Sequence, residues 1–384
     1  MPSMLFSGNL AVQEQSRQLF RCIFSAGRLT RPQILEQLNL PPTSLNRALD
    51  RLTEAGLIEV TGQAESTGGR PASLFQIRSD ARLMLGISLE PSSPATIHLM
   101  MLDLSLRPVV QNRLILSSGN AAVEITAAAA ELERAARLTI PPDSATSDGA
   151  KNDGSPYLIG IGIDGFGLLT EADQAALQTA LTAHFSCPVL YADGLTGAPF
   201  LLGNTSNQQE GSFALLSLDD PIQLVNGFSH AVPANTPATS IGAYPLPDHL
   251  EDKDQPLRPL RDLLSPTALG RRFALSHNRP ELDFADFCLA LKQQKKKAVR
   301  LLKASASELA LAVVGISCVT GLNNIMVSGE LFDTMAELFP QTADKAAELK
   351  KDFGIIFRLE RQPYGSDLRA AGIAAMVLAT EMDS

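Results

Sequence analysis

The residues best suited to chemistry in this sequence are five polar ones clustered between positions 43 and 51. They are Thr43, Ser44, Asn46, Arg47 and Arg51. Hydroxyl, amide and guanidinium groups hydrogen-bond to the edges of DNA bases and to phosphate oxygens, so the chemistry that this set indicates is DNA recognition. That chemistry requires a rigid element that presents the side chains on one side.

The neighbouring apolar residues predict a helix as this support. Four of them recur at helical spacing and form a stripe away from the polar set: Leu45, Ala48, Leu49 and Leu52. Pro42 suits the first turn, where a missing N–H costs nothing, and Gly56 suits a left-handed cap after the last turn. The alternative for the polar side is the solvated face of an ordinary helical bundle.

A second short helix and a two-stranded wing complete the motif. Residues 31–38 carry apolar side chains at helical spacing and end at the break Asn39–Pro42. After the polar helix, residues 57–60 and 73–77 have strand-like composition. The tip between these strands includes Gly68, Gly69, Arg70 and Pro71. Residues 1–80 are therefore predicted to form a winged helix-turn-helix, which places one helix in a DNA groove.

Three arginines are expected to supply phosphate contacts of this module: Arg31, Arg47 and Arg51. Arg70, next to Gly69, can approach a narrow minor groove without steric hindrance, although a plain hairpin with a solvated arginine is the alternative. Residues 1–80 hold eight arginines and seven acidic residues, a net charge of +1, whereas the rest of the chain carries −10. Phosphate attraction is thus local and modest, which favours a dimer on a two-fold DNA site.

Composition limits the compartment and the number of domains. The 384 residues suggest two or three domains, and no apolar run is long enough to span a membrane. The N-terminus lacks the basic region and apolar core of a signal peptide. Four cysteines without a CxxC pair, Cys22, Cys187, Cys288 and Cys318, support neither a zinc site nor a disulfide framework, so a cytoplasmic location is expected.

The larger segment, residues 81–384, alternates strands and helices in two halves. The first half is expected to hold strands at 83–89, 96–102, 108–116, 157–163 and 188–191 and helices at 121–138, 171–184 and 195–202. The second half is expected to hold strands at 212–217, 221–232, 324–328 and 355–359, an irregular insertion at 245–281, and helices at about 282–303, 305–320 and 364–381. This order predicts a duplicated α/β fold with a cleft between two lobes.

Particular runs of residues carry a family resemblance over about residues 10–380. The wing tip Gly69-Arg70-Pro71 is preceded by Gly68, and the larger segment contains the runs GISLEP, GIGIDGFG, PVLYADG and IMVSGEL. In these the chain resembles the ROK family (repressors, open reading frames and sugar kinases), in its repressor branch. The resemblance implies an actin-like ATPase fold, related to RNase H, for residues 81–384, and it implies a homodimer.

The phosphate loop departs from the kinases of that family. Those enzymes follow the first strand with an Asp and a Gly-Gly-Thr loop, whose N–H groups hold nucleotide phosphates. Here Ser88 replaces the Asp, and Glu90 and Pro91 replace the two glycines. Pro91 has no N–H to donate, and Glu90 places a negative charge where phosphates would lie, so ATP binding is not expected.

The catalytic base and the zinc site depart as well. In the family an Asn-Asp pair supplies the base that deprotonates the sugar hydroxyl. A gapless match places Asp193 on the Asn and Gly194 on the Asp, whereas a one-residue shift places Asp193 on the Asp; a capping role for Asp193 is a further alternative. Ser240 replaces the sugar-binding Glu, and Ala243 replaces the zinc-binding His.

These departures predict a regulator that is not an enzyme and needs no metal or cofactor. The expected function is a DNA-binding transcriptional repressor of carbohydrate-related genes, with double-stranded operator DNA as its partner and no contact with a membrane. Its large domain is expected to sense a small hydroxylated molecule such as a sugar. The alternatives are a ligand-free dimeric regulator and an active sugar kinase.

The effector is expected in the cleft, near the carboxyl ends of the strands that end at Ile163 and Tyr191. The polar groups available there are Asp164, Asp193, Thr196 and Ser240, with Tyr244 as a stacking surface.

Overall fold

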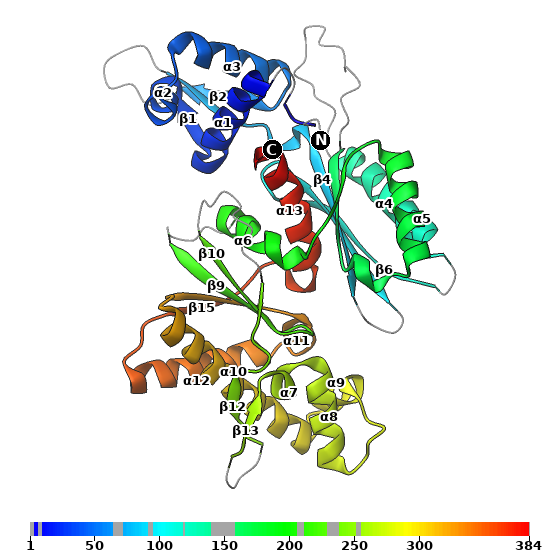
Figure 1. The fold of residues 1–384 in the computed structure, drawn as a ribbon. Coiled ribbons are helices and arrows are strands. Elements are labelled where there is room, and N and C mark those ends of the chain that lie inside the picture. Colours follow the sequence, from blue (N-terminus) through cyan, green and yellow to red (C-terminus); the bar gives the residue numbers. More distant parts are fainter. Residues whose placement is uncertain are drawn as a thin grey trace. The chain divides into compact units, whose positions relative to one another are not determined.

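The computed structural model describes residues 4–6, 10–63, 72–90, 95–117, 120–139, 158–205, 211–228, 238–250 and 255–383. Contacts divide the chain into two compact units (Figure 1). Unit 1 runs to Asn207 and resumes at Arg369, and unit 2 holds most of the residues between them. The predicted domain boundary at residue 80 falls inside unit 1 and stays a prediction.

The N-terminal part of unit 1 contains three helices and a three-stranded antiparallel sheet in the order β1-β3-β2. The helices are α1 (Leu10–Ala26), α2 (Arg31–Leu38) and α3 (Pro42–Glu54), and the strands are β1 (Arg28–Thr30), β2 (Ile58–Gln63) and β3 (Ser73–Ile77). Helices α2 and α3 and the two wing strands lie where the sequence predicts them. Helix α1 and strand β1 are additions to the expected elements.

The turn between α2 and α3 follows from its residue types. Asn39 adopts a left-handed conformation (φ 49°), which Asn tolerates better than most residues, and its N–H bonds to the Leu35 carbonyl. Pro42 begins α3, and Gly56 after its end has φ 68°, as predicted. Helix α1 buries Leu19, Phe20 and Ile23 and packs against both α2 and α3. The buried face of α1 thus completes the core of a three-helix module.

The larger part of unit 1 is a five-stranded sheet in the order β6-β5-β4-β7-β8. Its strands are β4 (Leu83–Glu90), β5 (Thr96–Asp103), β6 (Pro108–Ile115), β7 (Leu158–Asp164) and β8 (Val189–Tyr191). Strands β4, β5 and β6 form an antiparallel meander, and β7 and β8 run parallel to β4. The helices are α4 (Ala121–Thr139), α5 (Glu171–Phe185), α6 (Gly194–Thr205) and α13 (Leu368–Asp383).

Strand β4 is buried on both faces because helices cover the sheet from two sides (Figure 1). Leu85, Ile87 and Leu89 alternate toward the core shared with α4 and α5. Gly86 points to the other face, where a β-carbon would lie 1.8 Å from the Ala370 carbonyl oxygen of α13. Only glycine therefore allows α13 to pack this closely on the strand.

Unit 2 repeats the same sheet order, β11-β10-β9-β14-β15. Its strands are β9 (Ser212–Ser217), β10 (Gln223–Phe228), β11 (Thr239–Ser240), β14 (Asn324–Ser328) and β15 (Arg358–Arg361). Strands β9 to β11 again form an antiparallel meander, and β14 and β15 again run parallel to β9. The matching topologies confirm the predicted duplicated α/β fold.

The remaining elements of unit 2 are helical apart from one hairpin. They are the hairpin strands β12 (Pro245–Pro247) and β13 (Leu257–Pro259), and helices α7 (Arg261–Leu264), α8 (Pro266–His277), α9 (Phe284–Lys292), α10 (Lys296–Thr320), α11 (Glu330–Thr334) and α12 (Leu338–Phe353). The expectation of an irregular insertion at 245–281 is therefore wrong. Pro266 is compatible with α8 because it occupies the first turn, and the Ser265 hydroxyl accepts the Ala268 N–H as a cap.

The break between the two long helices also differs from the prediction. It falls at residues 293–295, where Gln294 has φ 54°, and not near residue 304. Helix α10 is long and apolar enough, by length and composition, to cross a membrane, which the sequence analysis did not expect of any segment. However, 67% of its apolar window is buried inside the structure, as in the core helix of a soluble protein.

Candidate DNA-binding surface and effector site

Helix α3 presents one apolar and one polar face. Its apolar stripe, Leu45, Ala48, Leu49 and Leu52, is buried. Thr43, Asn46 and Arg47 are exposed on the other side, and Ser44 is half-buried. The residues singled out for base and phosphate contacts thus lie on a solvent-facing surface of a rigid helix, which is the geometry that groove binding requires.

Two of the predicted DNA-binding arginines are less free than Arg47. The Arg51 side chain is half-buried, and its Nη1 is buried with no hydrogen-bond partner among the described residues. The guanidinium of Arg31, at the start of α2, lies 5.6 Å from the centre of the Phe75 ring of β3. Arg47 is therefore the best placed of the three to reach a partner.

The wing strands β2 and β3 pair as expected, with an irregularity between Val60 and Gly62. The tip with Gly69 and Arg70 lies outside the described residues, so the predicted minor-groove contact of Arg70 stays a prediction.

In unit 1, the ends of β4 and β7 bring Ser88 and Asp164 together. The two residues are register partners on adjacent parallel strands, and the Ser88 hydroxyl donates to Asp164 Oδ2 at 2.8 Å. The Gly194 N–H donates to Asp164 Oδ1 at 3.1 Å. Burial raises the pKa of the Asp164 carboxyl above its ordinary value, although Arg369 and these two hydrogen bonds act in the opposite direction.

Asp193 follows β8 and caps helix α6. Its Oδ1 accepts the Leu195 N–H at 2.9 Å, as in the capping alternative, and its carbonyl accepts the Thr196 N–H. The same Oδ1 also accepts a hydrogen bond from Arg369 Nη1 at 3.0 Å, and that nitrogen lies 3.6 Å from Asp164 Oδ2. Three predicted effector residues, Asp164, Asp193 and Thr196, therefore lie close together, and an arginine from α13 contacts both carboxylates.

The gapless sequence match aligns Gly194 with the catalytic aspartate of the kinases. A β-carbon at Gly194 would lie 2.3 Å from the carbonyl oxygen of Arg369. The backbone of α13 therefore occupies the space that an aspartate side chain would need at this position.

Glu90 also occupies a setting unlike a phosphate loop. It is the last residue of β4 and pairs in register with Thr96 of β5. Its Oε1 lies 3.3 Å from Nε2 of the buried His98. In an extended strand, successive N–H groups point to opposite sides, whereas a phosphate loop needs several N–H groups that converge on one anion.

The other two predicted effector residues belong to unit 2. Ser240 is exposed in the two-residue strand β11. Tyr244 packs partly buried against the core of unit 2, where its hydroxyl lies over Gly315 of α10.

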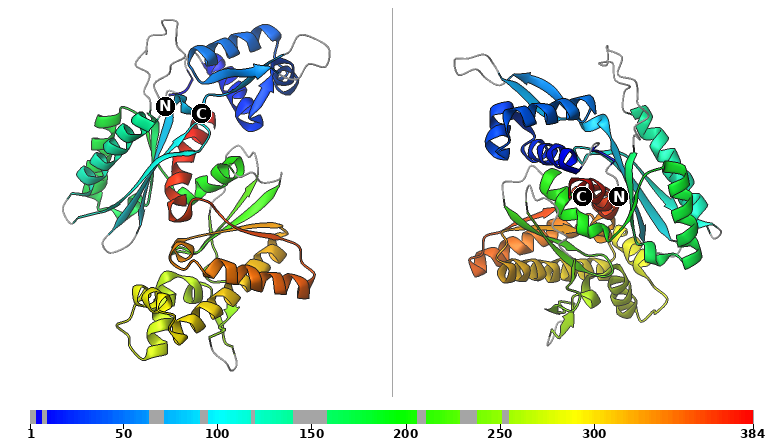
Figure 2. Two further views of the ribbon diagram at one scale, coloured as in Figure 1. Left: turned by 180° about the vertical axis from the view of Figure 1, so that it is seen from behind. Right: turned by 45° about the horizontal axis from the view of Figure 1, so that its top comes forward.

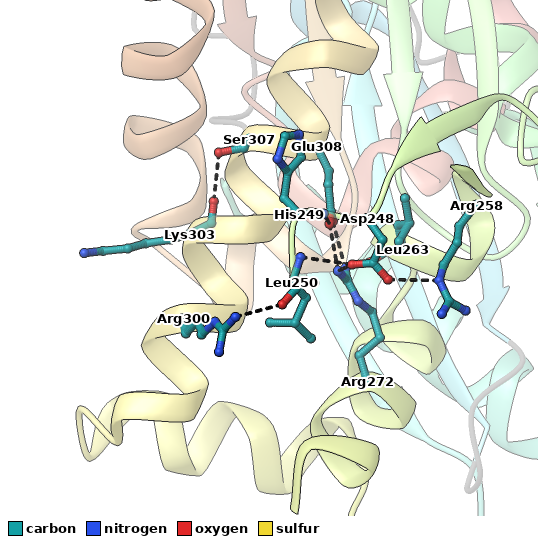
Figure 3. Close-up of polar contacts among 10 residues, drawn as sticks. All are labelled: Asp248, His249, Leu250, Arg258, Leu263, Arg272, Arg300, Lys303, Ser307 and Glu308. Atoms are coloured by element: carbon teal, nitrogen blue, oxygen red, sulfur yellow. Dashed lines mark hydrogen bonds and ion pairs between the residues drawn. The ribbon is translucent and has the colours of Figure 1, made fainter. Parts of the chain in front are cut away.

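A second arginine cluster, which the sequence analysis missed, lies inside unit 2 (Figure 3). Arg272 of α8 donates to both carboxylate oxygens of Glu308 of α10 and to Asp248 Oδ1 after β12, each at 2.7 Å. The His249 N–H donates to Glu308 Oε1 at 3.0 Å, and Arg258 of β13 pairs with Asp248 Oδ2 at 2.9 Å. The cluster fixes the β12–β13 hairpin to α8 and α10.

The comparisons with known proteins agree with this architecture. Residues 13–59 match a family model described as winged helix-turn-helix DNA-binding. The comparison with curated proteins gave no match.

Three solved structures illustrate the similarity of the fold. A ROK family transcriptional regulator, described as a homolog of the E. coli Mlc protein, is 14% identical, with a TM-score of 0.64 and coverage of 96% of this chain and 97% of that chain. A ROK hexokinase from Thermus thermophilus is 15% identical, with a TM-score of 0.52 and coverage of 77% and 98%. A ROK family glucokinase from Streptomyces griseus, in complex with glucose and AMPPNP, is 13% identical, with a TM-score of 0.50 and coverage of 77% and 98%. The chain thus has a winged helix-turn-helix followed by the two-lobed actin-like fold of ROK proteins, as the sequence predicts.

Proposed function

We propose that this protein is a cytoplasmic, homodimeric transcriptional regulator of the ROK family that represses carbohydrate-related genes. The observation that carries the proposal is the exposed Thr43, Asn46 and Arg47 face of α3 in a winged helix-turn-helix. This face is joined in one chain to a fold that sugar kinases share. A DNA-reading module attached to a sugar-binding type of fold suits a sugar-responsive regulator.

The large domain binds an effector without transferring phosphate. Support comes from Glu90, which extends strand β4 and lies beside His98, and from Gly194, whose surroundings leave no room for a catalytic carboxylate. Asp193 Oδ1 already accepts the Leu195 N–H and a hydrogen bond from Arg369, so this oxygen is engaged and is not free to take a substrate hydroxyl as a catalytic base must.

The proposed effector is a neutral hydroxylated molecule such as a sugar. Carboxylates accept hydrogen bonds from hydroxyl groups, and Asp164 and Asp193 lie together at the carboxyl ends of β7 and β8 in unit 1. A nucleoside triphosphate would be repelled by these two carboxylates and by Glu90. Ser240 and Tyr244 belong to unit 2, and their effector role stays a prediction.

Selection of genomic DNA fragments by the full-length chain, followed by gel-shift titration at fixed salt, tests the DNA-binding role. Asn46→Ala and Arg47→Ala should each weaken specific binding by about 1–3 kcal/mol if the side chain reaches a base. Arg107→Ala, an exposed arginine between β5 and β6, is the matched control and should leave affinity unchanged. Equal affinity of all three variants and the wild type would exclude α3 as the recognition helix.

Two further measurements test the remaining parts. A coupled ATP-turnover assay with a panel of sugars should show no turnover, and turnover with any sugar would establish a kinase. A thermal-shift screen should reveal the effector, because a ligand at a hundred times its Kd adds about 2.7 kcal/mol to stability. Silence across a broad panel would favour a ligand-free regulator, and sedimentation that gives only monomer would refute the homodimer.

A further inference from the structure

Helix α13 begins at the proposed effector site. Arg369, in its first turn, is the residue that pairs with Asp193 and lies beside Asp164. Asp193 is only partly buried, so this ion pair is within reach of a ligand from solvent. The guanidinium thus occupies a hydrogen-bonding position on a carboxylate that the proposed function assigns to the effector.

The other end of α13 contacts the DNA-binding module. The Glu381 carboxylate accepts the N–H groups of Met4 and Leu5 at 3.0 and 3.3 Å. Its carbonyl accepts a hydrogen bond from Arg17 Nε of α1 at 3.1 Å, and both residues are buried. Arg21 of α1 pairs with Asp383 at 2.8 Å. Residues 4–6 and the C-terminal end of α13 accordingly lie side by side (Figure 2).

Helix α6 makes a second connection between the same two places. It starts at Gly194, whose N–H donates to Asp164, and it is capped by Asp193. Farther along, Phe200 of α6 stacks on Phe24 of α1, with ring centres 5.8 Å apart. Two helices that begin at the carboxylates therefore contact α1, which in turn packs against the recognition helix α3.

The packing of α13 makes it a stiff element. β-Carbons at Gly86, Gly194 and Gly197 would lie 1.8–2.3 Å from backbone oxygens of α13, so the helix backbone rests directly on β4 and α6. About 18 Å separate Arg369 from Glu381 along the helix axis, at 1.5 Å per residue. No side chains lie between these parts of the α13 backbone and β4 or α6. A displacement of α13 is therefore a rigid-body movement and not a rearrangement of side chains.

We propose that Arg369 is an internal occupant of the effector site, and that its displacement from Asp193 is passed through α13 to α1 and the recognition helix. This proposal rests on the proposed effector role of Asp164 and Asp193. In the paired state, α13 holds α1 through Arg17 and Arg21, and this state binds DNA. An effector hydroxyl that donates to Asp193 Oδ1 competes with the guanidinium and so favours the state in which α13 is released.

Hydrogen–deuterium exchange on the full-length chain without DNA or ligand tests the coupling directly. Arg369→Met should speed exchange in α1 and in residues 4–6, far from the substitution. Arg258→Met, which removes an arginine paired with an aspartate in unit 2, is the matched control and should leave α1 unchanged. Faster exchange confined to α6 and the first turns of α13, with α1 as in the wild type, would overturn the proposal.

A second pair of variants keeps the proposal testable if Arg369→Met does not fold. Asp193→Asn removes the negative charge of the same ion pair but keeps the Oδ1 that caps α6, so it should loosen α1 in the same direction as Arg369→Met. Arg369→Lys keeps the charge without the planar fork and should have an intermediate effect. If both variants fold and leave α1 exchange at the wild-type rate, the coupling is absent.

The affinity for a DNA fragment selected by the wild type separates this proposal from the proposed function. Arg369→Met should weaken binding about tenfold, within the roughly 5- to 150-fold range of coupling energies. A wild type that binds no DNA, together with a loosened α1 in Arg369→Met, would refute the proposed function and support the coupling. Normal DNA affinity in Arg369→Met would refute the coupling and leave the regulator role standing.

Discussion

The two units each contain an arginine that bridges two carboxylates, yet the two clusters differ in burial. In unit 2, the exposed fractions of the Arg272, Asp248 and Glu308 side chains are 7%, 6% and 0%. In unit 1, those of Arg369, Asp193 and Asp164 are 19%, 38% and 7%, so the difference lies at the arginine and at Asp193. Arg272 makes shorter contacts with its carboxylates and also donates to the Leu263 carbonyl, although its Nε is buried without a hydrogen-bond partner among the described residues.

This difference separates a structural cluster from an exchangeable one. Charges removed from water cannot lose a partner without a large penalty, so the Arg272 cluster is expected to stay formed whenever unit 2 is folded. An ion pair near solvent is worth little because water competes for both groups. The Arg369–Asp193 contact is therefore the one that a ligand could replace at the lower cost, as the proposed coupling requires.

Removing the buried arginine should give the largest effect. Arg272→Met leaves Asp248 and Glu308 buried without their partner, so we expect a loss of about 3–5 kcal/mol in the free energy of unfolding. Urea titration of the full-length chain measures it. Arg258→Met removes the exposed partner of the same Asp248 and should cost less than about 1 kcal/mol. Equal losses in both variants would contradict the distinction between the clusters.

Disturbing the close packing of α13 on β4 should cause the next largest loss of stability. Gly86→Ala places a β-carbon against the backbone oxygen of Ala370, which cannot move without the helix, and should cost about 1–3 kcal/mol. Gly315→Ala is the control in unit 2, where the β-carbon meets the hydroxyl end of Tyr244, a side chain that can rotate away. Thermal unfolding of both variants tests this, and a greater loss in Gly315→Ala would contradict it.

The smallest effect should come from Asp164 and should depend on pH. Burial raises the pKa of Asp164, so folding favours its protonated form. Below the ordinary aspartate pKa of about 3.9, Asp164 carries no penalty; as pH rises through its higher native pKa, the native state loses stability. Asp164→Asn removes this penalty, and its stability relative to the wild type should increase from pH 3 to pH 7.

The Asp103 carboxyl, whose pKa burial also raises, is present in both proteins, so its contribution cancels in that comparison. Denaturant unfolding across pH measures the difference. If the wild type instead becomes more stable relative to Asp164→Asn as pH rises, the ion pair with Arg369 outweighs the effect of burial.

The sequence by itself determined the elements whose signals are local. The apolar stripe of α3, Pro42 at its start and Gly56 after its end lie within one short segment, and helical periodicity and backbone preference are local properties. The alternation of strands and helices likewise fixed the duplicated α/β class. At residues 245–281, prolines and charges predicted an irregular chain, and this prediction was wrong. Pro266 is compatible with the first turn of α8, and α8 is stabilised by packing against α10.

Only the tertiary structure decided which polar residues share a site. Asp193 and Arg369 are 176 positions apart, and Arg17 and Glu381 are 364 apart, so no spacing along the chain could connect them. Burial was equally inaccessible from the sequence: Arg47 and Arg51 are the same residue type on the same predicted helix, yet Arg47 is exposed and Arg51 is half-buried. Hydrogen bonding and exposure depend on which elements pack together, and packing is set by the whole fold rather than by neighbouring residues.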